Sequence, residues 1–406
     1  MSIRVEHGAA VVPGFRFAGV ASGLKANGRL DLGLAVADEP LPAGAVFTTN
    51  LVKAAPVTIA AERVAKGKIR AILANSGCAN ACTGEAGLAA TRAATLAVAK
   101  ALGAREGEVF PASTGVIGAL LNVEKVAARV PELVAALSEN ADRFAESILT
   151  TDRSAKVVNA RGEIAGRPFT VLGIAKGAGM IHPAMAPLVP HATMLAFLFT
   201  DAAADSASLS AALPGVADAT FNQASVDGDT STNDTLVVLA SGRAGTELST
   251  NGAIAAPLRD AMTLVCDELA KKMVADGEGA EHLVELHVSG LASDADAARI
   301  ARTVATSPLV KTALYGKDPN WGRILGAAGR ANVPFDPTRA RIVVGGVTIV
   351  DGGVARGASA EAEAHQIMLR PTYRIDLILG DGPGRSRYLT CDLGLGYVRC
   401  NADYRS

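Results

Sequence analysis

Residues 176–200 read KGAGMIHPAMAPLVPHATMLAFLFT, and this stretch constrains the fold more than any other part of the chain. From Gly177 to Thr200 it contains no Asp, Glu, Lys or Arg, a length that could cross a bilayer. The prolines at positions 183, 187 and 190 interrupt any continuous helix, because proline lacks the N–H that a helix interior uses. The segment Met194–Thr200 is an uninterrupted apolar run, typical of a buried strand. We therefore expect a buried loop that leads into a core strand, and no membrane span.

Strand-like and helix-like segments alternate on both sides of this loop. Short apolar runs bounded by Gly, Pro or Asn predict strands at Ala45–Thr49, Ile69–Ala74, Val109–Phe110, Val171–Ala175, Leu236–Ala240 and Leu283–Ser289. Longer periodic segments predict helices at Gly84–Leu102, Val123–Ala136, Ala141–Leu149, Ala255–Ala275 and Ser293–Ser307. A short helix is expected at Ser206–Leu213, stopped by Pro214 and Gly215. The fold class expected from this pattern is α/β (α+β).

Composition and charge exclude several classes of protein. The chain has 406 residues, 49% of them hydrophobic and only 19% charged, which argues against disorder. The 39 basic and 40 acidic side chains give a net charge of −1, so no overall basic field would attract nucleic acid or an anionic membrane. The five cysteines are scattered, and the first residues lack the apolar core of a signal peptide. We expect free thiols and a cytoplasmic location.

Thr193, between the proline loop and the apolar run, is a candidate nucleophile. A hydroxyl is a weak nucleophile unless a base lies beside it. Cutting the peptide bond before Thr193 would free an α-amine with a pKa of about 8, which could serve as that base. The alternative is an ordinary β-branched residue opening a strand, and spacing alone favours it.

Two other loops carry candidate chemistry. Thr114 and Gly115 follow a short strand, where a hydroxyl and a close backbone N–H could form an oxyanion hole; the alternative is an ordinary turn. Glu278 lies between two glycines and could hold an ammonium group, or the segment could simply end a helix.

We expect neither a metal nor a cofactor. The acidic loop Asp227–Asp234 lacks the Gly and Glu that a calcium loop requires. Cys78 and Cys82 have no second ligand pair that would complete a zinc site. No phosphate-binding loop and no dinucleotide-binding glycine fingerprint is present.

Taken together, nine motifs in order resemble the ornithine acetyltransferase family, also called bifunctional glutamate N-acetyltransferase, of arginine biosynthesis. The resemblance extends from end to end. Its motifs are Asn75–Asn80, Pro111–Gly118, Thr150–Asp152, Lys176–Ile181, Ala192–Leu195, Phe221-Asn through Asn233–Thr235, Asp276–Ala280, Lys317–Arg323 and Tyr397–Tyr404.

The resemblance implies a layered α/β sandwich of the ornithine acetyltransferase/DmpA type that cleaves itself between Ala192 and Thr193. The products would be an α chain, residues 1–192, and a β chain, residues 193–406, assembled as two α and two β chains. Thr193 would be the nucleophile and supply its own amine base, with Thr114 and Gly115 as the oxyanion hole. The residues implied to bind substrate are Thr151, Lys176, Thr193, Glu278, Asn401 and Ser406.

The implied reaction moves an acetyl group from N-acetylornithine to glutamate through an acetyl ester on Thr193, and acetyl-CoA could serve as a second donor. The alternative is an aminopeptidase or amidase of similar architecture that also uses an N-terminal threonine. One departure from the family pattern stands out: Pro187–Ala192 separates Met185–Ala186 from Thr193 as an apparent insertion.

Overall fold

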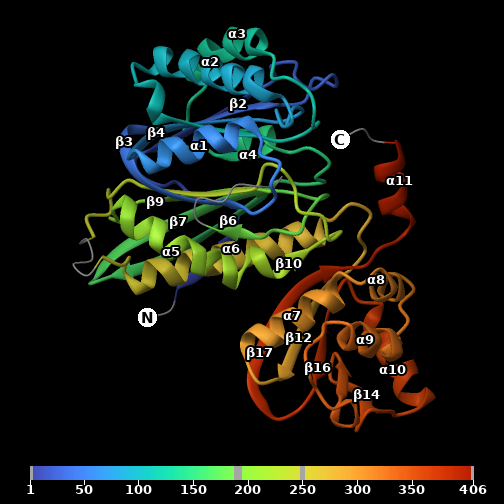
Figure 1. Cartoon of the computed structure of the whole chain (residues 1–406). Coiled ribbons are helices and arrows are strands. Elements are labelled where there is room, and N and C mark those ends of the chain that lie inside the picture. Colours follow the sequence, from blue (N-terminus) through green and yellow to red (C-terminus); the bar gives the residue numbers. More distant parts are fainter. Residues whose placement is uncertain (1–2, 187–193, 247–251, 404–406) are drawn as a thin grey trace. The chain divides into compact units, whose positions relative to one another are not determined.

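The computed structural model describes residues 3–186, 194–246 and 252–403, which form two compact units. Among these residues, the first unit takes those up to 222 and from 229 to 273, and the second takes 223–228 and those from 274 onwards. Both units combine helices with a sheet, so the predicted α/β class is confirmed (Figure 1). The expected chain boundary between residues 192 and 193 lies outside the described residues and stays a prediction.

The first unit is built on a ten-stranded sheet with the order β1-β6-β7-β9-β11-β3-β4-β5, while β2 and β8 also pair with β3. Its strands are β1 (Arg4–His7), β2 (Phe15–Val20), β3 (Leu32–Thr48), β4 (Lys68–Asn75), β5 (Val109–Ser113), β6 (Lys156–Ile164), β7 (Arg167–Lys176), β8 (Met185–Ala186), β9 (Leu195–Thr200) and β11 (Thr235–Ala240).

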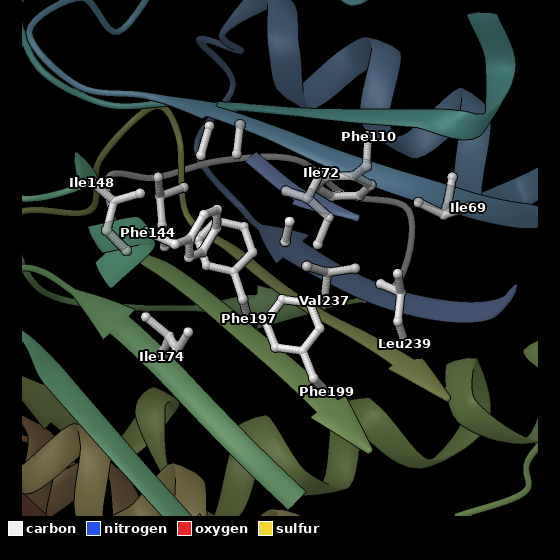
Figure 2. Close-up of a cluster of buried hydrophobic side chains, with 14 of the residues drawn as sticks. Ile69, Ile72, Phe110, Phe144, Ile148, Ile174, Phe197, Phe199, Val237 and Leu239 are labelled. Carbon is white, nitrogen blue, oxygen red and sulfur yellow. The ribbon is translucent and has the colours of Figure 1, made fainter. Parts of the chain in front are cut away.

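Strand β3 joins two parts of this sheet. Its first half pairs with β2 and β4, the register shifts between Val36 and Leu41, and its second half pairs with β11 and β8. Phenylalanines fill the space between the two parts: Phe17 and Phe199 meet edge to face at 5.0 Å, and Phe47 and Phe110 stack at 6.3 Å. Figure 2 shows this core, in which the described side chains are almost wholly buried.

Helices cover both outer faces of the first unit and complete a layered sandwich (Figure 1). Helices α2 and α3 pack on the part that contains β2 and β4, and α5 and α6 on the part that contains β7 and β9. The contacts are close: a Cβ added at Gly173 in β7 would lie 2.3 Å from Val265 in α6. The helices of this unit are α1 (Ala55–Ala65), α2 (Gly84–Leu102), α3 (Val123–Ala135), α4 (Asp142–Ser147), α5 (Ser206–Ala219) and α6 (Ala256–Ala275), with 3-10 turns at Glu106–Glu108 and Phe221–Gln223.

The second unit contains a seven-stranded sheet with the order β10-β17-β12-β16-β13-β14-β15. Its strands are β10 (Ala224–Ser225), β12 (Leu283–Gly290), β13 (Arg341–Val344), β14 (Val347–Asp351), β15 (Val354–Ala355), β16 (Thr372–Ile378) and β17 (Gly382–Cys391). Its helices are α7 (Asp294–Ala305), α8 (Pro308–Tyr315), α9 (Trp321–Gly329), α10 (Ala358–Met368) and α11 (Leu395–Asp403), with a 3-10 turn at Pro337–Arg339. Apolar side chains of the sheet and of α7 to α10 form its core.

The predicted end of one helix is wrong. Helix α5 continues through Pro214 to Ala219 instead of stopping after Leu213. A proline inside a helix costs about 3 kcal/mol. Burying Leu209, Leu213 and Val216, each at most 2% exposed, contributes about 1.5–3 kcal/mol per side chain and outweighs that cost.

The helix α1 was not expected from the sequence, which indicated only strands in this part of the chain. Within the described residues, no helix is both long and apolar enough to traverse a bilayer.

Candidate active site

Lys176 lies where strand β7 ends beside the start of strand β9. It is the last residue of β7 and lies opposite Leu195, the first residue of β9. Its ammonium group is buried, with 2% of the side chain exposed. Nζ donates hydrogen bonds to Thr114 Oγ1 at 3.1 Å and to Thr150 Oγ1 at 2.9 Å. Lys176 and Thr114, which the sequence assigned to different roles, are therefore in direct contact.

These contacts determine what Thr114 can donate. An ammonium group has no lone pair, so Thr114 Oγ1 must be the acceptor in its bond with Lys176. The Thr114 backbone N–H already donates to Asn75 O at 3.0 Å. Of the two hydrogens that Thr114 could donate, only the hydroxyl hydrogen remains, and the nearby positive charge makes it a stronger donor. This is the donor that an oxyanion hole requires.

Gly115 follows in a conformation and a space that only glycine tolerates. Its φ is +124°, and an added Cβ would lie 2.5 Å from Gly77 C and 2.7 Å from Cys78 N. The Gly115 backbone therefore packs directly on the peptide between Gly77 and Cys78. Burial raises the pKa of the Cys78 thiol, which disfavours the thiolate that a nucleophilic cysteine needs.

Two asparagines join the Asn75–Asn80 motif to Ser113, the residue before Thr114. Ser113 Oγ donates to Asn75 Oδ1 at 2.6 Å, and Asn75 Nδ2 donates to Cys78 O at 2.8 Å. The Asn233 amide, after the polar loop 227–232, donates to Ala79 O at 2.7 Å and to Ser113 O at 2.8 Å. These bonds fasten the Asn75 motif and the Thr114 motif to each other.

The carboxylate of Asp152 lies beside both Lys176 and Thr150. Its Oδ1 accepts from Lys156 Nζ and from the Gly177 N–H, both at 2.7 Å, and its Oδ2 lies 3.9 Å from Lys176 Nζ. Burial alone would raise the pKa of this carboxyl, but the ammonium groups of Lys176 and Lys156 hold it well below its usual range. Asp152 is therefore ionised, and its charge stabilises both buried ammonium groups.

The second unit brings together another pair of expected residues. Asn401 Nδ2 donates to Glu278 Oε2 at 2.8 Å. Gly279 makes this possible: its φ is +69°, and an added Cβ would lie 2.2 Å from Tyr397 N, so a side chain there would push helix α11 away. Glu278 follows the end of α6, a position that is consistent both with a segment that simply ends the helix and with a carboxylate that could hold an ammonium group.

The expected site residues fall into four sets. Thr114, Gly115 and Lys176 lie together in the first unit, and Glu278 and Asn401 pair in the second. Thr151 is half-buried, and no hydrogen bond of its side chain to another described residue is found. The expected residues that lie outside the described part of the chain are Ala192, Thr193 and Ser406.

Sequence reasoning did not assign roles to Thr150, Asp152 or Asn75, although all three lie in motifs that it quoted. The hydroxyl, carboxylate and amide in those motifs were the available signal. No group of three or more His, Cys, Asp or Glu side chains in the described residues could hold a metal ion.

Comparisons with known proteins assign nearly the whole chain to one protein family. The model of the ArgJ family matches residues 16–406. The arginine biosynthesis bifunctional protein ArgJ of Geobacter sulfurreducens is 45% identical over 97% of this chain and 100% of its own length. Its counterpart from Desulfotalea psychrophila is 46% identical with the same coverage. The crystal structure of ornithine acetyltransferase from Mycobacterium tuberculosis, complexed with ornithine, is 41% identical, covers 46% of this chain and 100% of that one, and has a TM-score of 0.43. The chain belongs to the ArgJ family.

Proposed function

We propose that this protein transfers an acetyl group from N-acetylornithine to glutamate, giving ornithine and N-acetylglutamate for arginine biosynthesis. Thr193 Oγ attacks the acetyl carbonyl, its α-amine takes the hydroxyl proton, and that proton passes to the departing amine of ornithine. Glutamate then attacks the acetyl ester through its own amine, and Thr193 recovers its proton. The acetyl ester divides one difficult amide exchange into two easier steps.

The hydrogen bond from Lys176 to Thr114 is the observation that carries this proposal. Because Lys176 can only donate, the Thr114 hydroxyl hydrogen is directed away from it and is available for the negative oxygen of a tetrahedral intermediate. Gly115, with no side chain, supplies a backbone N–H at the adjacent position. A donor reinforced by a buried ammonium group suits acyl transfer.

The chain direction supports Thr193 as the nucleophile. Thr193 precedes Leu195 by two residues, and Leu195 pairs with Lys176 across the sheet. Strand β9 begins at Leu195 and pairs with β7. Cleavage between Ala192 and Thr193 would therefore leave a new N-terminus only two residues before this strand pair.

The charges suit amino-acid substrates. The ammonium group of Lys176 is buried and lies 3.9 Å from a carboxylate oxygen of Asp152, and we propose that it also attracts the carboxylate of an amino-acid substrate. We assign Thr151, Lys176, Asn401 and Ser406 to the polar atoms of the substrate, and Glu278 to the ornithine ammonium.

Family membership favours transfer over the aminopeptidase or amidase alternative. We also propose that acetyl-CoA can serve as a second acetyl donor. The assembly of two α and two β chains and the cytoplasmic location belong to this proposal as well.

Steady-state kinetics test the shared intermediate. A common acetyl ester requires parallel double-reciprocal plots when N-acetylornithine is varied at several fixed glutamate concentrations. Intersecting lines would mean that both substrates bind before reaction, and the covalent role of Thr193 would be wrong.

A further inference from the structure

Lys25 makes an unusual set of contacts for a loop lysine. It lies in the loop between β2 and β3, and Nζ donates to Leu30 O at 2.9 Å and to Leu149 O at 2.6 Å. The first bond stays within the loop, whereas the second reaches a residue that is distant in the sequence. Leu149 immediately precedes Thr150, which accepts a hydrogen bond from Lys176.

The loop that carries Lys25 is itself fixed. Asp31 is fully buried, and its Oδ1 accepts from the Ser22 N–H at 2.5 Å and from Ser22 Oγ at 2.7 Å. Its Oδ2 accepts from the Lys25 N–H at 2.8 Å. The Asp31 carbonyl accepts from the Ser76 N–H at 2.9 Å, which ties the loop to the Asn75 motif. The Lys25 side chain therefore starts from a defined backbone position.

The aliphatic stem of Lys25 reaches the other side of the oxyanion hole. A Cβ added at Gly77 would lie 3.1 Å from Lys25 Cγ, so stem and glycine are packed without spare room. The Gly77 carbonyl carbon in turn lies 2.5 Å from the position that a Gly115 Cβ would occupy. The Lys25 side chain therefore lies next to Gly77, whose peptide packs on Gly115, and it also donates to the carbonyl of Leu149, the residue before Thr150.

We propose that Lys25 is a positioning residue that braces both parts of the oxyanion hole: Gly115 through Gly77, and Thr114 through Leu149, Thr150 and Lys176. The inference rests on the proposed function of Thr114 and Gly115. Lys25 does not touch the reacting atoms in this account. Removing it would let the Leu149–Asp152 turn and the Gly77 peptide shift, and the two donors would lose their common alignment.

The charge environment gives this brace a pH dependence. The groups that interact electrostatically with Lys25 are Arg29, Asp31, Lys176 and Asp152. Burial, followed by the positive charge of Arg29, lowers the pKa of Lys25 to about 8. Below that pH the ammonium has three hydrogens to donate, and above it the neutral amine is a weaker donor, so the brace weakens as the pH rises through about 8.

The test compares Lys25→Met, Lys25→Arg and the matched control Lys125→Met in the full-length enzyme. Lys125 Nζ also donates to this loop, to Gly23 O at 2.6 Å, but it is exposed and makes no bond to the Leu149 turn. Because misplacing catalytic groups by about 1 Å can cost roughly a hundredfold in rate, we expect Lys25→Met to lower kcat by about tenfold to a hundredfold. The KM values for N-acetylornithine and glutamate should change far less.

In the wild-type enzyme, the weaker brace should lower the rate as the pH rises through about 8. Lys25→Arg should have a higher kcat than Lys25→Met, and its rate should fall only at higher pH, because a guanidinium stays protonated. Lys125→Met should behave as the wild type. Unchanged kcat in Lys25→Met, or a raised KM at unchanged kcat, would overturn the positioning role.

Hydrogen exchange separates this inference from the proposed function. Peptides covering residues 75–78 and 147–152 should exchange faster in Lys25→Met but not in Lys125→Met, whatever the reaction catalysed. Equal exchange in the two variants would overturn the brace even in an active enzyme. A wild-type enzyme that transfers no acetyl group would instead refute the proposed function and leave the exchange comparison valid.

Discussion

Replacing Asp152 by Asn removes the carboxylate that Lys156 and Lys176 share. The three side chains are 0%, 1% and 2% exposed, so their charges are shielded very little by solvent. An exposed ion pair contributes at most about 1 kcal/mol. Removing one partner of a buried pair typically costs about 3–5 kcal/mol, because it leaves an uncompensated buried charge. Because these three side chains are buried, the larger value applies, and we expect Asp152→Asn to lower the free energy of unfolding by about 3–5 kcal/mol.

The pH dependence of this loss has a definite sign. The pKa of Asp152 is held below its usual range by Lys176 and Lys156, against the opposing effect of burial. A depressed carboxyl pKa contributes stability that is fully present above the unfolded value of about 3.9 and is lost as the pH falls through the folded value. The difference between wild type and variant should therefore stay constant from about pH 5 to pH 8 and shrink only in stronger acid.

Urea unfolding followed by far-UV circular dichroism measures the effect. Fluorescence is less suitable, because Trp321, the single tryptophan of the chain, lies in the second unit. Asp260→Asn is the control: its ion pair with Arg259 is about half exposed on both sides, and its loss should change stability by no more than about 0.5 kcal/mol. The double variant Asp152→Asn/Lys156→Met, which also removes the buried Lys156 ammonium group, should be less destabilised than Asp152→Asn alone. A loss below about 1 kcal/mol in Asp152→Asn would refute the claim that this carboxylate neutralises a buried cluster.

Three further predictions concern the oxyanion hole and the cleavage. Thr114→Ala removes a hydroxyl donor and should raise the barrier by about 3 kcal/mol, seen as a loss in kcat, whereas near-normal turnover would contradict its role. Gly115→Ala places a Cβ 2.5 Å from Gly77 C at a φ of +124°, so activity should fall sharply, and a fully active Ala variant would contradict the close packing. Thr193→Ala should be inactive and should remain one chain on a denaturing gel. The wild-type enzyme should show two chains, and N-terminal sequencing of the second should begin Thr-Met-Leu. Cleavage of the Ala variant would exclude Thr193 as the residue that cuts the chain.

Local sequence signals predicted many of the elements around the site. The apolar run that ends at Thr200 predicted strand β9, and it forms the centre of the first unit's sheet. Helix α2 begins and ends where its alanine pattern does, and Gly103 closes it in a left-handed conformation with φ +61°. These features depend on nearby residues, so a single sequence is sufficient to indicate them.

Features that depend on distant contacts could not be predicted in this way. Helix α5 continues past Pro214 because its apolar side chains are buried, although a proline in the sequence predicts the end of a helix. Asp152 resembles any turn aspartate until the fold brings Lys176 beside it. Lys25 carries no motif, and its contact with Leu149 joins parts of the chain that only the tertiary structure brings together.

The family resemblance assigned Thr114 and Gly115 to an oxyanion hole and Lys176 to substrate binding, and the structure brings Lys176 into contact with Thr114. Lys176 reaches Thr114 because β7 and β5 end near each other, which no spacing in the sequence reveals. The donor direction of the Thr114 hydroxyl follows only from that contact.

The covalent acetyl-enzyme is the central claim, and intact-mass spectrometry tests it most directly. Purified enzyme incubated with N-acetylornithine alone should gain one acetyl mass on the chain formed by residues 193–406, and added glutamate should remove it. Thr193→Ala, incubated in the same way, should gain none. Active enzyme that never carries the acetyl group on that chain, or that carries it equally in Thr193→Ala, would contradict the account.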